Sequence, residues 1–177
     1  MSGRSITQSR LRCAIMTACD TLAEQALARL KQTGQTLCTA ESCTGGLLGK
    51  LLTDIPGSSQ SYLGGVISYT NGVKATLLQV DRTLLDTAGP VSEPVAKQMA
   101  QGIQAALGGS FGLSITGLAG PDSDESGRPV GLVYIGLAGA GVPMCQELHL
   151  QGSRAAIREQ ACEAALALLL QVLRQYQ

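Results

Sequence analysis

Residues 36–57 read TLCTAESCTGGLLGKLLTDIPG, and this stretch decides the fold. Thr36 to Ala40 has the length of a strand, and the pair Gly45-Gly46 separates it from an apolar run that ends at Leu52. The following Ile55-Pro56-Gly57 is typical of a turn, because proline and glycine interrupt regular structure. The stretch therefore predicts a strand, a loop and a helix in that order, as in α/β proteins.

The chain on either side of this unit continues the alternation. Apolar residues at helical spacing, with Gly34 as a stop, predict an amphipathic helix before it: Leu11, Ile15, Ala18, Leu22, Ala26 and Leu30. Further strands are expected at 62–69, 111–116, 130–138 and 144–150, the last two as an antiparallel hairpin. Further helices are expected at 71–80, at 93–107 with Ser92 as its cap, and from a Ser153 cap to residue 174.

This order of elements predicts the fold class. We expect α/β architecture: a single three-layer α/β/α domain with a mixed, largely parallel sheet covered by helices on both faces. The length of 177 residues suits one domain, which we place at 12–174, with residues 1–11 as an N-terminal tail. The core is expected to be aliphatic, because 45% of the residues are hydrophobic and only 3% are aromatic.

Composition also excludes several classes of protein. Thirteen basic and thirteen acidic residues cancel, so nucleic acid is not an expected partner. Ala164 to Leu170, the longest apolar run, is far shorter than the roughly 20 residues of a membrane span. Met1 to Arg12 does not resemble a signal peptide. We therefore expect a cytoplasmic protein with no membrane partner.

The cysteines show neither a CxxC pair nor the spacing of zinc ligands, so no metal site is expected. Buried free thiols are the better interpretation of all six: Cys13, Cys19, Cys38, Cys43, Cys145 and Cys162.

Ser42 stands at the exit of the first predicted strand, directly before the residues that begin a helix. Backbone N–H groups at a helix start are unpaired, so they can stabilise an oxyanion or bind a phosphate. Ser42 is therefore a candidate nucleophile, although Ser42 or Thr44 can equally be a simple helix cap. Neither a P-loop nor the GxSxG elbow of α/β-hydrolases fits this stretch, because Leu51 follows Lys50 and the glycine spacing differs.

A nucleophilic serine needs a base. The single histidine, His149, lies in a strand-like pattern between Leu148 and Leu150, which favours a structural role. Lys74 is the leading candidate, because a desolvated lysine can lose its proton near neutral pH. It follows the predicted strand end where ligands usually approach an open α/β sheet. A solvated helix lysine is the alternative.

Five motifs in order resemble the CinA C-terminal-domain family: Ala40-Glu41-Ser42-Cys43-Thr44-Gly45-Gly46; Ser68-Tyr69-Thr70-Asn71 with Lys74; Val91-Ser92-Glu93; Thr116-Gly117-Leu118-Ala119-Gly120-Pro121; and Gly152-Ser153-Arg154. The resemblance runs from about residue 12 to 173 and is to the stand-alone members, which lack a molybdopterin-binding-like domain. Those members are similar in activity to amidohydrolases that convert nicotinamide mononucleotide and water to nicotinic acid mononucleotide and ammonia, in pyridine-nucleotide recycling. The resemblance implies no cofactor and suggests a homodimer.

The resemblance also implies roles for individual residues. Ser42 would be the nucleophile, Lys74 its base, and Tyr69 a neighbour that positions the proton or the substrate. The substrate would meet backbone donors at the helix start, a second strand end, an amide that orients Lys74 or the carboxamide, and a guanidinium for its phosphate: respectively Thr44, Gly45 and Gly46; Thr116 and Gly117; Asn71; and Arg154.

The chain departs from many relatives in the acidic segment Asp122 to Arg128, where they have more glycine. Acidic groups beside a phosphate site would repel the substrate unless they point away or are paired. This segment leaves open an amidase for a different amide. A second alternative is a module in which the same loops bind a pyridine nucleotide without catalysis. Cys43 is a weaker candidate nucleophile than Ser42, because neighbours on an extended segment face opposite ways.

Overall fold

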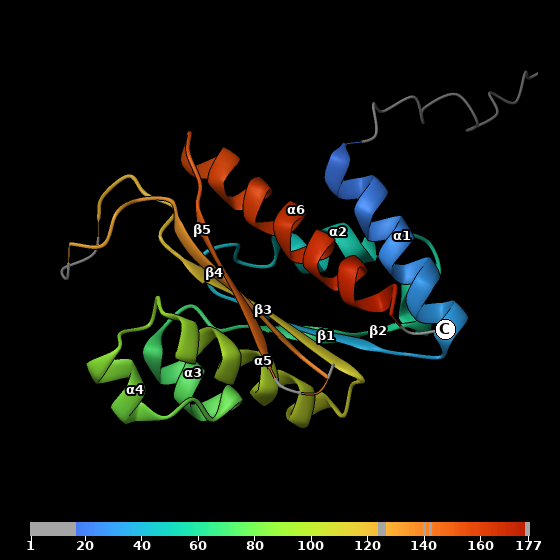
Figure 1. Ribbon diagram of the computed structural model, residues 1–177, viewed down its shortest axis with the longest axis horizontal. Helices are drawn as coiled ribbons and strands as arrows, with labels where there is room; N and C mark the ends of the chain where they lie inside the picture. The colour runs from blue at the N-terminus through green and yellow to red at the C-terminus, as the bar shows by residue number, and fades with distance from the viewer. Residues whose placement is uncertain (1–16, 124–126, 140, 142, 176–177) are drawn as a thin grey trace, which may run out of the picture.

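The computed structural model describes residues 17–123, 127–139, 141 and 143–175 (Figure 1). Its elements alternate along the chain as the sequence predicts, in the order α1 (Ala18–Thr33), β1 (Leu37–Glu41), α2 (Leu47–Thr53), the short 3-10 helix η2 (Ser58–Gln60), β2 (Tyr62–Ile67), α3 (Asn71–Leu78), α4 (Arg82–Thr87), α5 (Glu93–Leu107), β3 (Phe111–Gly117), β4 (Leu132–Ala138), β5 (Met144–His149) and α6 (Arg154–Leu173).

The strands form one mixed sheet in the order β2-β1-β3-β4-β5. The pairs β1–β2 and β1–β3 are parallel, whereas β3–β4 and β4–β5 are antiparallel. Four of the five strands therefore run in one direction and β4 runs in the other. The antiparallel hairpin expected from the sequence is the pair β4–β5. In the parallel part, the carboxyl ends of β1, β2 and β3 meet at one edge of the sheet, where ligands usually bind in such folds.

Helices cover both faces of the sheet, which confirms the three-layer α/β/α domain (Figure 1). Helices α1, α2 and α6 pack on one face and share an aliphatic core with the sheet that includes Leu30, Leu52 and Leu169. Helices α3, α4 and α5 cover the other face around a smaller core that includes Leu78 and Met99.

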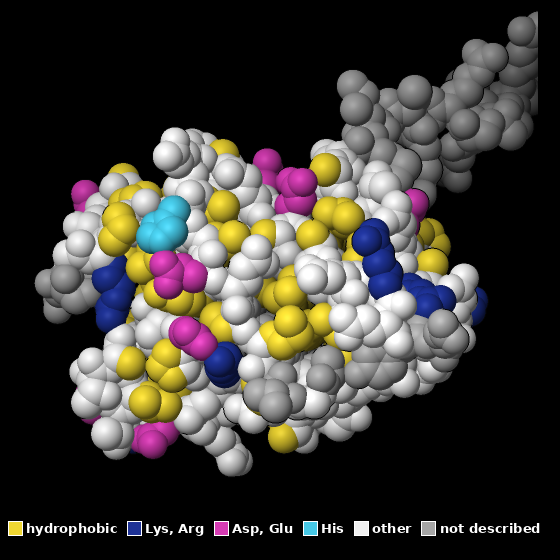
Figure 2. Space-filling model, viewed as in Figure 1, with side chains coloured by type: hydrophobic (Ala, Val, Ile, Leu, Met, Phe, Trp, Pro, Cys, Tyr) yellow, Lys and Arg dark blue, Asp and Glu magenta, His cyan; other side chains and the backbone are white. Residues whose placement is uncertain are grey.

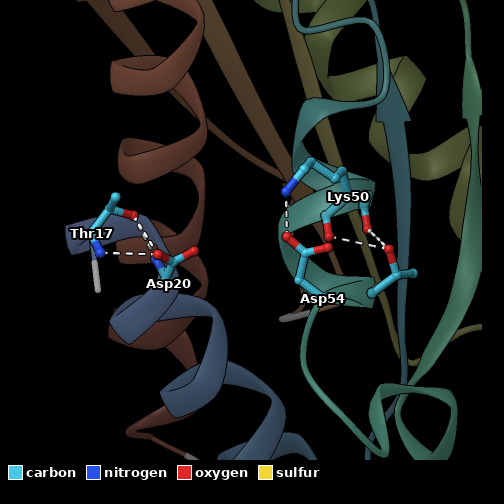
Figure 3. Close-up of polar contacts among 6 residues, drawn as sticks. Thr17, Asp20, Lys50 and Asp54 are labelled. Carbon is cyan, nitrogen blue, oxygen red and sulfur yellow. Dashed lines mark hydrogen bonds and ion pairs between the residues drawn. The ribbon is translucent and has the colours of Figure 1, made fainter. Parts of the chain in front are cut away.

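Helix α1 begins at a reciprocal capping box. The Thr17 hydroxyl accepts from the Asp20 amide at 3.2 Å, and the Asp20 carboxylate accepts from the Thr17 amide at 2.9 Å (Figure 3). At the other end, Gly34 adopts a left-handed conformation (φ 66°), so it is the stop that the sequence predicts. Leu11 and Ile15, which were expected to extend this helix, lie outside the described residues.

Helix α5 lies directly on β3 and β4, because two strand residues have no side chain to hold it off. A Cβ at Gly112 would lie 2.0 Å from the Ala100 carbonyl oxygen, and one at Gly136 would lie 2.3 Å from that of Ala96. Between them, Ser114 Oγ donates to the Ala96 carbonyl at 2.6 Å. This close packing fixes the start of α5 near the edge of the sheet where β3 ends.

Three details differ from expectation. Ser92 precedes α5, but its hydroxyl donates to the Gly89 carbonyl at 2.8 Å and makes no capping bond; the Ser153 cap of α6 is present. Helix α4 was not expected. Cys145 is only partly buried, whereas four other thiols are buried and Cys13 lies outside the described residues.

Among the elements described, no helix combines the length and apolar character needed to cross a membrane.

Candidate active site

A pocket of about 310 Å³ opens at the edge where β1, β2 and β3 end. Its walls come from the loop after β1, the start of α3, the loop before α5, the segment after β3 and the start of α6. They are lined by Ser42, Cys43, Tyr69, Asn71, Lys74, Pro90, Val91, Thr116, Gly117, Leu118, Ala119, Gly120, Asp122 and Arg154. Seven residues predicted from the sequence to act in catalysis or substrate binding thus line one cavity: Ser42, Tyr69, Asn71, Lys74, Thr116, Gly117 and Arg154.

The centre of the pocket is a contact between Ser42 and Lys74. The Lys74 Nζ donates to Ser42 Oγ at 3.1 Å and to the Ser68 carbonyl at 2.8 Å. Lys74 is only 1% exposed, and Ser42 is 8% exposed. Lys74 is therefore not a solvated helix lysine, and its amine has the geometry of a base for the Ser42 hydroxyl.

Burial lowers the pKa of Lys74 from its ordinary 10.5 to about 8, because a charged ammonium loses hydration inside the protein. A substantial fraction of the amine is then neutral in mildly alkaline solution. Burial acts in the opposite direction on Cys43, whose pKa it raises to about 11. The Cys43 thiol thus stays protonated, which leaves Ser42 as the better placed nucleophile.

The backbone amides at the start of α2 already donate hydrogen bonds within the protein. The Glu41 carboxylate, which is 2% exposed, accepts from the amides of Gly46 at 3.0 Å, Leu48 at 3.1 Å and Gly49 at 2.8 Å. The Gly45 amide donates to the Ser42 carbonyl at 3.1 Å. The expectation that Gly45 and Gly46 offer free donors to a substrate is therefore wrong.

Two backbone amides directly after Ser42 are not used in these contacts. Within the part of the chain that the structure describes, those of Cys43 and Thr44 make no hydrogen bond to a backbone carbonyl, whereas Ser42 N donates to the Ile115 carbonyl at 2.9 Å. Thr44 is fully buried and outside the pocket lining, and its Oγ1 has no hydrogen-bond partner among the described residues.

Other predicted residues lie around this centre. Tyr69 is 60% exposed at the pocket and makes no hydrogen bond to Ser42 or Lys74 within the described chain. Asn71 begins α3 at the pocket wall. Thr116 is buried, and its hydroxyl donates to the Pro90 carbonyl at 2.8 Å, which ties the end of β3 to the loop before α5. A Cβ at Gly117 would lie 2.6 Å from Val133 Cγ2, so only glycine fits there.

Arg154 and Asp122 place opposite charges in one pocket. The exposed Arg154 guanidinium donates to the Gly120 carbonyl at 2.6 Å, which brings the first turn of α6 against the loop after β3. Asp122 contributes to the same cavity, while Asp124 and Glu125 of the acidic segment lie outside the described residues. Arg128 is outside the pocket lining, and its Nη2 donates to the Ala88 carbonyl at 2.5 Å.

His149 lies on the surface at the end of β5 and not in the pocket (Figure 2). Its Nε2 is 2.8 Å from Glu147 Oε1, and the other oxygen of Glu147 accepts from the Tyr134 hydroxyl at 2.8 Å. Setting His149 aside as the base is therefore consistent with the geometry. No cluster of three or more His, Cys, Asp or Glu side chains suited to a metal ion occurs within the described part of the chain.

Sequence reasoning missed the structural parts that hold the site. Glu41 was quoted within a motif but was given no role, and the signal that could have shown one is an acid placed just before a helix start. Ser68 also acts through its backbone: its amide donates to the Glu41 carbonyl at 2.7 Å and its carbonyl accepts from Lys74. Backbone contacts of this kind leave no trace in residue types.

Comparison with known proteins gives a consistent result. The model of the CinA C-terminal domain family matches residues 19–173. A CinA-like protein of Syntrophomonas wolfei is 49% identical over 150 residues, which cover 85% of this chain and 36% of the relative. A CinA-like protein of Synechococcus sp. is 59% identical over 120 residues, which cover 68% of this chain and 28% of the relative. The chain thus spans roughly a third of these curated relatives.

Solved structures agree. The crystal structure of a competence-damaged protein (CinA) superfamily protein from Klebsiella pneumoniae has a TM-score of 0.86 at 31% identity, over 89% of this chain and 99% of that one. For the competence/damage inducible protein CihA from Agrobacterium tumefaciens, the TM-score is 0.85 at 34% identity, over 89% of this chain and 96% of that one. Because the family model and these structures match nearly the whole described domain, the chain belongs to the CinA C-terminal domain family.

Proposed function

We propose that the chain is an amidohydrolase that converts nicotinamide mononucleotide and water to nicotinic acid mononucleotide and ammonia, with Ser42 as nucleophile and Lys74 as base. The observation that carries the proposal is the buried Lys74 amine, 3.1 Å from Ser42 Oγ, with both residues in the lining of one pocket. Membership of the CinA family and the resemblance to its stand-alone deamidases support the choice of reaction.

The chemistry follows from these contacts. Neutral Lys74 accepts the Ser42 proton, and Oγ attacks the carboxamide carbon. The oxygen of the tetrahedral intermediate carries a negative charge, for which the Cys43 and Thr44 amides are the available donors. When the carbon–nitrogen bond breaks, Lys74 returns the proton to the leaving ammonia. A water molecule, deprotonated by Lys74, then hydrolyses the Ser42 ester and restores the serine hydroxyl.

The rest of the pocket suits a small anionic substrate. Its volume of about 310 Å³ falls at the lower end of ligand sites, as expected for a mononucleotide. Arg154 would bind the phosphate through charge-assisted hydrogen bonds. Tyr69 and Asn71 would then contact the nicotinamide end from the α3 side of the pocket. We propose that Tyr69 positions the proton or the substrate.

The test is release of ammonia from nicotinamide mononucleotide by the purified chain, with Ser42→Ala as control. Ammonia and nicotinic acid mononucleotide should appear in equal amounts with the wild-type chain and at background level with the variant. A wild-type chain that binds the nucleotide without releasing ammonia would support a non-catalytic binding module instead.

Asp122 favours a second candidate, an amidase for a different amide, because a carboxylate in the pocket opposes a doubly charged phosphate. A panel that pairs nicotinamide mononucleotide with nicotinamide riboside and non-nucleotide amides separates the two. Higher kcat/KM for an uncharged amide than for the nucleotide would favour this second function, with the same Ser42 and Lys74 chemistry.

The pKa of Lys74 predicts the pH dependence of the reaction. A lysine protonated below its pKa of about 8 cannot accept the Ser42 proton, whereas the neutral form above it can. We therefore expect kcat/KM to rise about tenfold per pH unit on the acid side and to level off above about pH 8. The measurement is kcat/KM across this range in buffers of constant ionic strength. A value that falls as the pH rises through this range would contradict a neutral lysine base.

Arg154→Ala should weaken substrate binding more than chemistry. A phosphate contact remote from the carboxamide stabilises ground state and transition state alike, so KM should rise while kcat stays near the wild-type value. An expected increase in KM of about tenfold corresponds to one charge-assisted hydrogen bond. Steady-state kinetics with nicotinamide mononucleotide measure both constants. A fall in kcat at unchanged KM would place Arg154 in the chemical step or in the support of the loop at Gly120.

A further inference from the structure

Arg158 lies one helical turn after Arg154 on α6 and points at the segment that carries Ser42. Its Nη2 donates to the Thr44 carbonyl at 2.7 Å, and a Cβ at Gly45 would lie 3.8 Å from the same nitrogen. In the described chain, the Thr44 carbonyl is the one acceptor of this partly buried guanidinium. Arg158 is outside the pocket lining, whereas Arg154 is part of it.

The contact continues to the nucleophile through one peptide unit. The Thr44 carbonyl that accepts from Arg158 belongs to the same peptide as the Gly45 amide, which donates to the Ser42 carbonyl at 3.1 Å. A hydrogen bond to the carbonyl of a peptide polarises its N–H and strengthens the bond that this N–H makes. Arg158 is thus linked to the Ser42 backbone by two consecutive hydrogen bonds.

The segment's own restraints are two turn hydrogen bonds, from Gly45 N to the Ser42 carbonyl and from Leu47 N to the Thr44 carbonyl, each at 3.1 Å. Arg158 adds a side-chain bond to the second of these carbonyls. Gly45 and Gly46 are consecutive glycines with positive φ (57° and 95°), and glycine has more backbone freedom than any other residue. The Glu41 carboxylate holds the far end, from Gly46 onward. On the near side, Ser42 N is fixed to the Ile115 carbonyl of β3. Between these two anchors, Arg158 is the side chain that binds the turn.

We propose that Arg158 is a positioning residue for the nucleophile. By holding the Thr44 peptide, it keeps Ser42 Oγ beside Lys74 and keeps the Cys43 and Thr44 amides directed at the oxyanion. This inference rests on the proposed Ser42 and Lys74 chemistry. It predicts that Arg158 contributes to kcat, whereas its neighbour Arg154 contributes to KM.

Arg158→Met and Arg158→Lys form the matched pair for a test. Both side chains are unbranched and of similar length, but only lysine can donate to the Thr44 carbonyl. We expect Arg158→Met to lower kcat by roughly 10- to 100-fold with KM nearly unchanged, since misplacement of a catalytic group by about 1 Å has effects of that size. Arg158→Lys should recover a large part of the loss. Arg174→Ala, at the exposed other end of α6, is the control.

A second readout does not depend on the substrate. The rate at which a fluorophosphonate probe labels Ser42, followed by mass spectrometry, should fall in Arg158→Met and recover in Arg158→Lys, while circular dichroism shows both variants folded. Equal kcat and equal labelling in the folded Arg158→Met and wild-type chains would overturn the inference, as would equal losses in both variants. Labelling of Ser42 without turnover of nicotinamide mononucleotide would contradict the proposed substrate. The labelling rates of the variants would then decide whether Arg158 positions Ser42. A wild-type chain that is neither labelled nor active would contradict the proposed function itself.

Discussion

Replacing Lys74 with methionine is expected to lower kcat by about 10³-fold or more, because methionine fills the same space and cannot accept the Ser42 proton. Lys74 Nζ is 3.1 Å from Ser42 Oγ, and the Ser68 carbonyl orients it from the other side. The variant removes the base without emptying the pocket. Binding of nicotinamide mononucleotide, measured by calorimetry, should therefore remain while ammonia release falls to background.

The stability of the variant separates chemistry from folding. Burial of an amine that prefers to be charged is unfavourable, as its lowered pKa shows, so Lys74→Met should have a melting temperature equal to or above that of the wild type. Lys97→Met is the control, because Lys97 pairs with Glu93 on the exposed side of α5. An inactive Lys74→Met chain with a lowered melting temperature would leave packing as the cause of the loss.

Lys74→Arg adds a test of the proton itself. A guanidinium stays charged at every pH of interest, so it keeps the positive charge beside Ser42 and cannot act as a base. We expect this variant to be as inactive as Lys74→Met. An active Lys74→Arg chain would rule out proton acceptance by Lys74 and leave it an electrostatic role. Tyr69, which lies at the same pocket, would then be the next candidate for the base.

The fold could be predicted because its signals are local. Glycine and proline mark the boundaries between elements: Gly34 at the end of α1, the Gly45-Gly46 pair before α2, and the Pro56-Gly57 turn before η2. The features of the fold that the sequence did not predict depend on tertiary contacts or on weak local signals. Helix α4 has six residues and only Leu85 buried, so it shows no apolar periodicity. The hydroxyl of Ser92 has a choice of acceptors, and its bond to Gly89 is set by the loop before α5.

The candidate site could be predicted as a set of residues but not as an arrangement. Ser42 and Lys74 are 32 positions apart, and the sequence gives no distance between them. They meet because β1 and β2 pair in parallel, which brings their carboxyl ends together. The prediction for Gly45 and Gly46 was wrong for a physical reason: the Glu41 carboxylate accepts from the Gly46 amide, as an acid near a helix start tends to do, and the Ser42 carbonyl accepts from the Gly45 amide.

Glu41 leads to the second large effect. Its carboxylate accepts three backbone hydrogen bonds from the start of α2 while it is almost fully buried. Glu41→Ala leaves three amides without this partner, that of Leu48 fully buried and those of Gly46 and Gly49 partly buried, and the loss of a partner for a buried amide has a typical cost of about 1–3 kcal/mol. We expect the free energy of unfolding to fall by about 3 kcal/mol or more, which lowers the melting temperature of a domain of this size by about 10 °C. Chemical denaturation and thermal melting followed by circular dichroism measure both.

The same substitution should also lower kcat, because it releases the far end of the turn that follows Ser42, while Arg158 still holds the turn at Thr44. Glu41→Gln is the informative intermediate: its amide oxygen can replace one acceptor, but its NH2 group would face the amides that the second carboxylate oxygen now binds. Its stability should therefore lie between those of Glu41→Ala and the wild type. Glu24→Ala, on the exposed face of α1, is the control for loss of a glutamate. If Glu41→Ala melted like the wild type, the three amides would have found water or other partners. The α2 start would then be open to anions, as the sequence alone suggested.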